Sequence, residues 1–262
     1  MAKKYDFVVI GGGLVGCMAS LSISSKNKSV CLIEKNKINK IITDDYSPLS
    51  LSINSVNFLK EKNIWDENLI KSNLIESLYI KLFNSFNTIK ISTSDINFES
   101  IGQVVDKASF LSYLRNLSKK NKNIDVIDNT ELDIKQLESL SKIYLPNESE
   151  AIDFGQLIVT DGANSKIAEK LNIPYKNINY DQTSYIFNGE YDSMENSTAQ
   201  IFTDKGVFAV LPGHGNKKSI VATVHNKFID DFKFESNTIN EHLLERQLLP
   251  YVKNLKNLKL IY

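Results

Sequence analysis

The sequence is poor in the residues that build disulfide frameworks and metal centres. Only two of its 262 residues are cysteines, Cys17 and Cys31, and three are histidines. Two cysteines cannot support a disulfide framework in a chain of this size, and both lie in apolar segments. We therefore expect buried free thiols and a reducing, cytoplasmic setting. The histidines His214, His225 and His242 have no cysteine or carboxylate at metal-ligand spacing, which predicts no metal site.

The chain also lacks net charge and long apolar runs. Lys and Arg together number 31, as do Asp and Glu, so no overall field attracts nucleic acid or an anionic membrane. The apolar run Phe7–Val15 is too short to span a bilayer, contains glycine, and is not followed by a small-residue cleavage site. Peripheral contact at the inner membrane is left open by these observations.

What the sequence does contain is a compact strand–helix–strand pattern at its beginning. Tyr5–Ile10 is short, β-branched and bounded by glycine, which is typical of a buried parallel strand. Leu14–Ser25 is predicted as a helix and Val30–Ile33 as a second buried strand. These three elements form one βαβ unit.

The pattern changes from helix-paired strands to unpaired strands further along. We expect helices over Leu51–Trp65 and Lys107–Lys119, a hairpin over Leu74–Ser94 with its turn near Asn84–Asn87, and a last helix from Thr238 to Pro250. Short strands are expected near Asp125–Ile127, Leu132–Ile134, Ile143–Leu145 and Gln156–Val159. Strands without intervening helices, typical of an antiparallel sheet, are expected at Thr183–Tyr191, Thr198–Thr203, Gly206–Leu211 and Lys218–His225.

The glycine-rich segment between the first strand and helix carries the strongest functional signal. Gly11-Gly12-Gly13-Leu14-Val15-Gly16 matches G-x-G-x-x-G in the strand–turn–helix context that the pattern requires. Gly11 allows the turn, Gly13 lets the backbone approach a pyrophosphate, and Gly16 lets helix and strand pack closely. The N–H groups at the helix start, around Leu14 and Val15, add a partial positive charge.

An acidic residue lies where such a site needs one. Glu34 ends the second strand, 18 residues after Gly16, and is placed to accept hydrogen bonds from a ribose diol; Lys35, which follows it, is also a candidate cofactor-binding residue. The motif predicts dinucleotide binding but leaves FAD and NAD both open, since both present ADP to this element.

A second segment favours the longer cofactor. Leu157–Val159 is a buried strand that leads into Thr160-Asp161-Gly162, and Asn164 or Ser165 caps a helix. A second backbone approach at Asp161-Gly162 suits an extended cofactor, although taken alone the segment is an ordinary turn followed by an N-cap.

These segments together resemble a known family. VVIGGGLVG with Glu34, then SLSINSVNFLKEKNIW, IGQVVDKASFLSYL, LIVTDGANSKIAEKLNIP and FTDKGVFAVLP occur in the order found in FAD-dependent aromatic hydroxylases. The resemblance is to the branch that hydroxylates polyprenylated phenols in ubiquinone biosynthesis, and it runs from Tyr5 to about Val224.

The resemblance implies an α/β fold of two interleaved parts. A Rossmann-like FAD-binding domain would comprise residues 1–72 and 100–175, and a mainly antiparallel substrate-domain sheet residues 73–99 and 176–235. Residues 236–262 would form a C-terminal helix and an incomplete end. The implied cofactor-binding residues are the glycine motif, Glu34 and Lys35, and Asp161 with Gly162.

The resemblance also implies a reaction in which the cofactor carries the chemistry. NAD(P)H or another donor reduces FAD, O₂ reacts with it, and a hydroxyl group is transferred to an electron-rich ring. No catalytic side chain is assigned. The implied partners are an aromatic or prenylated phenol and O₂, with peripheral membrane contact and a complex with other ubiquinone-biosynthesis proteins as further implications.

Three departures from the family pattern support alternative hypotheses. The family has arginines at the positions of Ser47 and Ala168, with Lys166 as the nearby positive charge, and a further Gly-Asp motif beyond the point where this sequence ends. The alternatives are a truncated or degenerate member that acts as a binding or complex component without hydroxylase activity, and a flavin or NAD oxidoreductase that is not an oxygenase.

Overall fold

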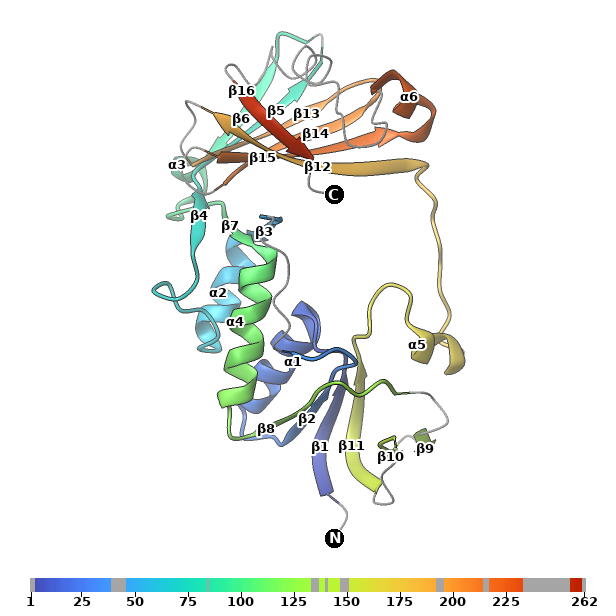
Figure 1. Cartoon of the computed structure of the whole chain (residues 1–262). Helices are drawn as coiled ribbons and strands as arrows, with labels where there is room; N and C mark the ends of the chain where they lie inside the picture. Colours follow the sequence, from blue (N-terminus) through green and yellow to red (C-terminus); the bar gives the residue numbers. More distant parts are fainter. Residues whose placement is uncertain are drawn as a thin grey trace. The chain divides into compact units, whose positions relative to one another are not determined.

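The computed structural model describes residues 3–38, 46–83, 85–132, 137–139, 141–146, 151–191, 196–213, 217–232 and 255–260. The chain divides into two compact units (Figure 1). The first comprises residues 1–43, 58–70 and 108–176, and the second residues 44–57, 71–107 and 177–262. Each unit is therefore assembled from segments that are distant in the sequence.

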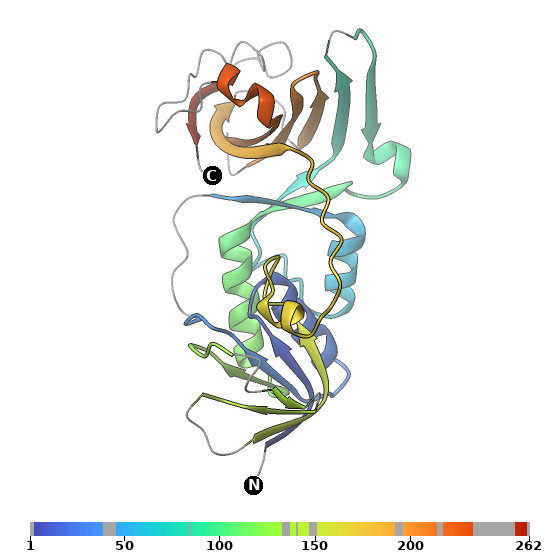
Figure 2. The same cartoon turned by 90° about the vertical axis from the view of Figure 1, so that its right-hand side faces the viewer.

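The first unit is built on a six-stranded sheet in the order β8-β2-β1-β11-β10-β9. The strands β8, β2, β1 and β11 are parallel, and β10 and β9 continue the sheet in antiparallel fashion (Figure 2). Their bounds are β1 Lys3–Ile10, β2 Val30–Ile33, β8 Ile124–Ile127, β9 Leu137–Ser139, β10 Lys142–Tyr144 and β11 Ala151–Val159.

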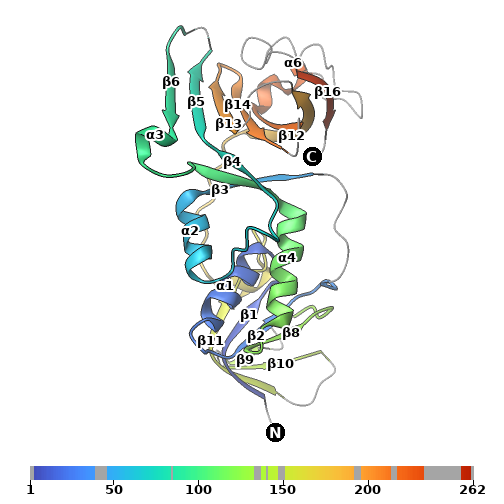
Figure 3. The same ribbon diagram turned by 90° about the vertical axis from the view of Figure 1, so that its left-hand side faces the viewer.

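The predicted βαβ unit is confirmed, because β1 pairs in parallel with β2 and the helix α1, Leu14–Ser24, connects the two strands. Figure 3 shows α1 running beside α4, Lys107–Lys120, and a short helix α5, Lys166–Lys170, follows β11. Every residue of β2 is buried, as expected for a parallel strand covered on both faces. The first unit therefore has a Rossmann-like arrangement.

The second unit contains a seven-stranded sheet in the order β16-β12-β15-β14-β13-β5-β6. Its bounds are β5 Ser77–Leu82, β6 Thr88–Ser92, β12 Gln182–Tyr191, β13 Ser197–Phe202, β14 Gly206–Pro212, β15 Lys217–His225 and β16 Leu255–Leu260. The predicted hairpin β5–β6 and the predicted strands β12 to β15 are confirmed. The sheet is not wholly antiparallel, since β13 pairs in parallel with β5.

One face of this sheet forms the core of the second unit. Alternate residues of the central strands are buried, because successive side chains of a strand point to opposite faces. The buried set is Phe187, Ile201, Phe208, Ile220, Ala222 and Val224. The described part of this unit also contains two short helices, α3 Thr93–Ile96 and α6 Ile229–Phe232, and a 3₁₀ turn at Asn226–Phe228.

A three-stranded antiparallel sheet, β3-β7-β4, was not predicted from the sequence. Its bounds are β3 Pro48–Ser52, β4 Ser72–Ile75 and β7 Gly102–Asp106. The prediction of a helix from Leu51 to Trp65 was wrong at both ends, because β3 runs to Ser52 and the helix α2 covers Ile53–Glu61. Leu49 and Leu51 pair with Val105 and Gln103, so a partner more than fifty residues away decides their conformation.

Two predictions lie outside the described residues. They are the helix from Thr238 to Pro250 and most of the strand near Leu132–Ile134. The other short strands are confirmed as β8, β10 and β11, of which β11 begins earlier than predicted.

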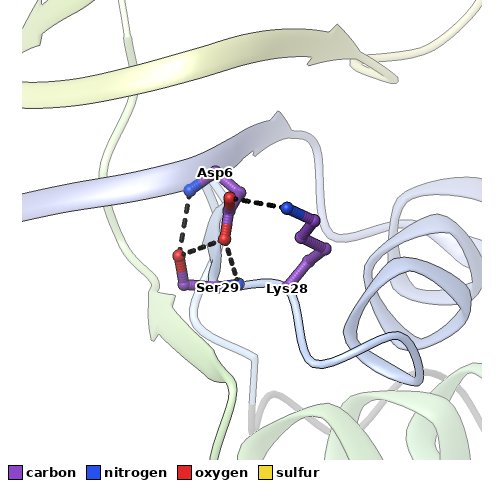
Figure 4. Close-up of polar contacts among 3 residues, drawn as sticks. All are labelled: Asp6, Lys28 and Ser29. Atoms are coloured by element: carbon purple, nitrogen blue, oxygen red, sulfur yellow. Dashed lines mark hydrogen bonds and ion pairs between the residues drawn. The ribbon is translucent and has the colours of Figure 1, made fainter.

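A polar cluster joins the beginnings of β1 and β2 (Figure 4). The Asp6 carboxylate accepts hydrogen bonds from the backbone N–H and the hydroxyl of Ser29, each at 2.9 Å, and from Lys28 Nζ at 3.2 Å. The Asp6 N–H donates to Ser29 Oγ at 2.9 Å. These bonds, chiefly those from Ser29, lower the pKa of Asp6 below its ordinary value of 3.8.

Replacement of Asp6 by Asn should therefore destabilise the chain in a pH-dependent way. A lowered pKa in the folded state contributes stability above the unfolded pKa, and this contribution is lost as the pH falls through the folded value. Urea unfolding in steps from pH 7 to about pH 3 should show the gap between wild type and Asp6→Asn narrowing below about pH 4. Lys28→Met is the control, because it removes only an exposed ion pair and should change stability little. A gap that does not vary with pH would contradict this account.

Candidate functional site

The glycine-rich loop lies between the carboxyl ends of three parallel strands of the first unit. It follows β1 at Ile10 and ends where α1 begins, with Gly13 as the N-cap residue. The Gly11 N–H donates to Ile33 O of β2 at 2.8 Å, and the Thr160 N–H, just after β11, donates to Ile10 O at 2.8 Å. The carboxyl edge of a parallel sheet is where such folds bind ligands.

Gly11 and Gly16 are required by the protein's own packing. Gly11 has φ of +104°, and a Cβ there would collide with the carbonyl of Thr160. A Cβ on Gly16 would collide with the Gly11 carbonyl oxygen and would lie 2.7 Å from Thr160 Oγ1. Loop, helix start and β11 can approach one another only because these side chains are absent.

Gly13 differs, because no contact with the described residues requires it to be glycine. Its φ of −77° and ψ of −172° are accessible to any residue, and a Cβ built on it would meet no atom within 4 Å. Serine or aspartate would cap α1 better. A glycine with open space in front of it at a helix start fits the close approach of a phosphate group.

Glu34 lies directly beside this loop. Its side chain is 6% exposed, Oε2 accepts the Gly12 N–H at 2.6 Å, and Oε1 accepts the Asn36 N–H at 3.0 Å. A carboxylate has about four lone-pair positions, so these two bonds leave capacity for a ribose hydroxyl. Lys35 follows it in an exposed position.

Asp161 and Gly162 follow β11, immediately beside the glycine loop. Asp161 Oδ1 is buried and has no hydrogen-bond partner within the described part of the chain. Gly162 has φ of +107°, and the space around its missing Cβ is open. An unpaired buried acceptor next to open backbone fits a polar ligand group that the protein alone does not supply.

The predicted N-cap of the following helix is confirmed at Ser165. Its hydroxyl accepts the Ala168 N–H at 3.0 Å and so begins α5. Ala168, at which the related family has arginine, is buried, and Ser47 precedes β3 with its N–H bound to Asp106.

Two residues that the sequence did not reveal also hold the loop. The Thr160 hydroxyl lies within hydrogen-bond distance of two carbonyl oxygens, that of Ile10 at 2.8 Å and that of Gly11 at 3.0 Å, and donates to them. Arg115, in α4, is 7% exposed, and its Nε donates to Gly12 O at 2.9 Å. The sequence carries no signal for either contact, since 103 residues separate Arg115 from Gly12.

The cysteines are inert in this environment. Both are free and buried, and burial raises the pKa of Cys17 to about 11 and that of Cys31 to about 12. Both therefore remain neutral thiols at physiological pH. Across the described residues, no three His, Cys, Asp or Glu side chains are grouped to hold a metal ion, and no helix is long and apolar enough to cross a bilayer.

The sequence of the chain is similar to those of known proteins. A sequence model of the family described as glucose inhibited division protein A matches residues 6–257. The chain is 28% identical over 231 residues to the mitochondrial ubiquinone biosynthesis monooxygenase COQ6 of Caenorhabditis elegans, covering 80% of this chain and 50% of that enzyme. It is also 28% identical over 164 residues to the tRNA uridine 5-carboxymethylaminomethyl modification enzyme MnmG of Mycoplasma capricolum, covering 62% of this chain and 25% of that enzyme.

The fold is shared with a solved flavoprotein. The structure of PqsL, described as a probable FAD-dependent monooxygenase from Pseudomonas aeruginosa, aligns over 99% of this chain and 73% of its own, with a TM-score of 0.71 and 11% identity. This likeness confirms the predicted α/β fold with an antiparallel sheet, and the sequence similarity to COQ6 confirms the resemblance to flavin-dependent hydroxylases. The chain spans about half the length of the ubiquinone-biosynthesis enzyme that it matches.

The same substitution at two glycines of the loop should have very different effects on stability. Gly16→Ser places a Cβ against the Gly11 carbonyl and should cost roughly 1–3 kcal/mol or more of unfolding free energy. Gly13→Ser meets open space and supplies a good N-cap, so stability should change by less than about 0.5 kcal/mol. Denaturant unfolding of both variants tests this, and equal losses would refute the distinction between the two glycines.

Proposed function

The chain belongs to the glucose inhibited division protein A family, and on that premise we propose that it binds FAD and takes part in the hydroxylation of an aromatic ring. The substrate class is a polyprenylated phenol of ubiquinone biosynthesis. The observation that carries the proposal is the open space at Gly13, in a loop that Glu34 holds at Gly12 and that lies beside Asp161, whose buried Oδ1 has no partner among the described residues.

The residues present fit the cofactor. The backbone of Gly11, Gly13, Leu14, Val15 and Gly16 would hold the pyrophosphate. Glu34, with Lys35 beside it, would accept the ribose hydroxyls, and Asp161 with Gly162 would lie along the remainder of the cofactor. Bound FAD would supply the redox and oxygen chemistry, with NAD(P)H or another donor as the electron source.

The second unit supports an apolar or aromatic substrate. The sheet face opposite its core carries a row of partly exposed apolar side chains, paired across neighbouring strands. This row consists of Ile186, Val221 and Ala209 on β12, β15 and β14, and the exposed Gln200 of β13 separates it from Ile80 of β5. Sites for small apolar ligands are lined predominantly by apolar side chains, which this face could contribute. We propose residues 73–99 and 176–235 as the substrate part and residues 1–72 and 100–175 as the FAD-binding part.

A second candidate is a member of the family that binds its partners without hydroxylating. It is favoured by Ala168 and Ser47, which stand where the related hydroxylases have arginines. Ala168 is buried and carries no charge to offer a cofactor. The second candidate lacks turnover and keeps at most part of the affinity for FAD, so flavin binding and turnover are tested separately.

The first test is flavin binding. The purified chain, incubated with FAD and desalted, should retain the two-peaked visible spectrum of an oxidised flavin. Gly13→Val should abolish retention, because its side chain fills the space that the pyrophosphate needs. Lys28→Met, at the opposite end of the strands, is the control and should retain the wild-type amount of flavin. A Gly13→Val protein with wild-type flavin content would overturn the assignment of the loop.

The second test is turnover. The FAD-loaded protein should consume O₂ in the presence of NAD(P)H, and a prenylated phenol should stimulate uptake with formation of the hydroxylated phenol. Addition of catalase separates this reaction from release of hydrogen peroxide, since only peroxide release returns oxygen. The assay is repeated with flavin that has been reduced chemically in place of NAD(P)H. If the protein retains flavin but forms no hydroxylated phenol with either source of electrons, hydroxylation is rejected and the second candidate is supported.

A further inference from the structure

Arg115 is a buried cation in an unusual setting. Its side chain is 7% exposed, and it reaches the glycine loop from α4. Among the described residues, no carboxylate forms an ion pair with it. Burial of a guanidinium without an anionic partner is costly, and buried arginines are ordinarily paired. The setting therefore suggests that an anion completes it.

The hydrogen bond from Arg115 acts on one particular peptide group. The Gly12 carbonyl that accepts its Nε–H belongs to the same peptide as the Gly13 N–H, and this peptide is trans. In a trans peptide, the C=O and N–H point in opposite directions. Drawing the carbonyl toward α4 therefore turns the Gly13 N–H away from α4.

Glu34 holds the preceding peptide in a complementary way. Its Oε2 accepts a hydrogen bond from the N–H of Gly12. The N–H of Gly12 is thus held by Glu34, at the end of β2, and the C=O of Gly12 by Arg115, on α4. Gly13 precedes the first turn of α1, where backbone N–H groups have no partner within the helix. Its N–H is thus a donor that the fold orients but does not use in the helix ladder.

We propose that Arg115 is a positioning residue for diphosphate binding, which orients the Gly13 N–H and places a positive charge behind it. This inference rests on the proposed function, and it concerns the diphosphate of FAD or ADP rather than the flavin ring. Arg115 acts through the Gly12–Gly13 peptide. A cation bound to the carbonyl strengthens the N–H of the same peptide as a donor, because hydrogen bonds in a chain polarise one another.

A merely structural role makes a different prediction. If Arg115 only ties α4 to the loop, its loss weakens the binding of every ligand of the site alike. If it orients a phosphate donor, its loss weakens the binding of ADP and leaves adenosine, which has no phosphate, nearly unaffected. The ratio of the two affinities therefore separates the roles.

The experiment compares ADP and adenosine binding by calorimetry, with FAD binding measured in parallel. Arg115→Met removes both the charge and the hydrogen-bond donor. It should weaken the binding of ADP and of FAD roughly 10- to 100-fold, as expected for a charge-assisted contact, and leave the affinity for adenosine unchanged. Arg115→Lys keeps the charge but not the Nε–H, and its ADP affinity should lie between those of wild type and Arg115→Met. Leu114→Val, at the buried apolar neighbour of Arg115 on α4, is the control and should keep the wild-type ratio.

The outcomes are distinct. If Arg115→Met loses ADP and adenosine affinity equally, or loses neither, the inference is overturned. The proposed function still stands in that case, provided that the wild-type chain binds FAD. A wild-type chain that binds neither FAD nor ADP refutes the proposed function, and the inference with it. Should Arg115→Met fail to fold, Arg115→Lys decides: a lowered ADP-to-adenosine affinity ratio supports the inference and an unchanged ratio overturns it.

Discussion

The close approach of Gly11, Gly16 and Thr160 is the constraint on which the rest of the first unit depends. β1 runs between β2 and β11, and the loop that leaves it must pass within contact distance of the backbone after β11. Only glycine at Gly11 and Gly16 permits this approach. Once it is made, α1 begins at the carboxyl edge of the sheet, with Gly13 as its N-cap residue.

A loop of this kind exposes backbone groups that need partners, and the protein supplies them from distant segments. Glu34 accepts from Gly12, Thr160 donates to Ile10 and Gly11, and Arg115 donates to Gly12. Buried polar groups are costly when unpaired, so these bonds hold the loop in one conformation. Two groups then remain available to a ligand: the Gly13 N–H, which lies outside the hydrogen-bond ladder of α1, and Asp161 Oδ1, which has no partner among the described residues.

The second unit is built on a different principle, in which alternation along the strands separates two faces of one sheet. The buried face of β12 to β15 forms the core, and the opposite face retains partly exposed aliphatic side chains. The parallel pairing of β13 with β5 joins a hairpin from the middle of the chain to strands from its later part. The β3-β7-β4 sheet likewise joins segments more than twenty residues apart.

The sequence by itself determined the βαβ unit, the glycine motif with Glu34, the N-cap at Ser165 and the strands β5, β6 and β12 to β15 of the large sheet, but not its edge strand β16. Each of these depends on local periodicity, turn chemistry or backbone freedom, and these are set by residues close together in the sequence. Only the tertiary structure decided that Leu51 lies in a strand, that β5 pairs in parallel with β13, and that Thr160 and Arg115 hold the glycine loop. These features arise from contacts between residues far apart in the chain. A side chain such as Arg115, beside Leu114 on an amphipathic helix, carries no local sign of the carbonyl that it will meet, because that partner is fixed by the packing of α4 beside α1.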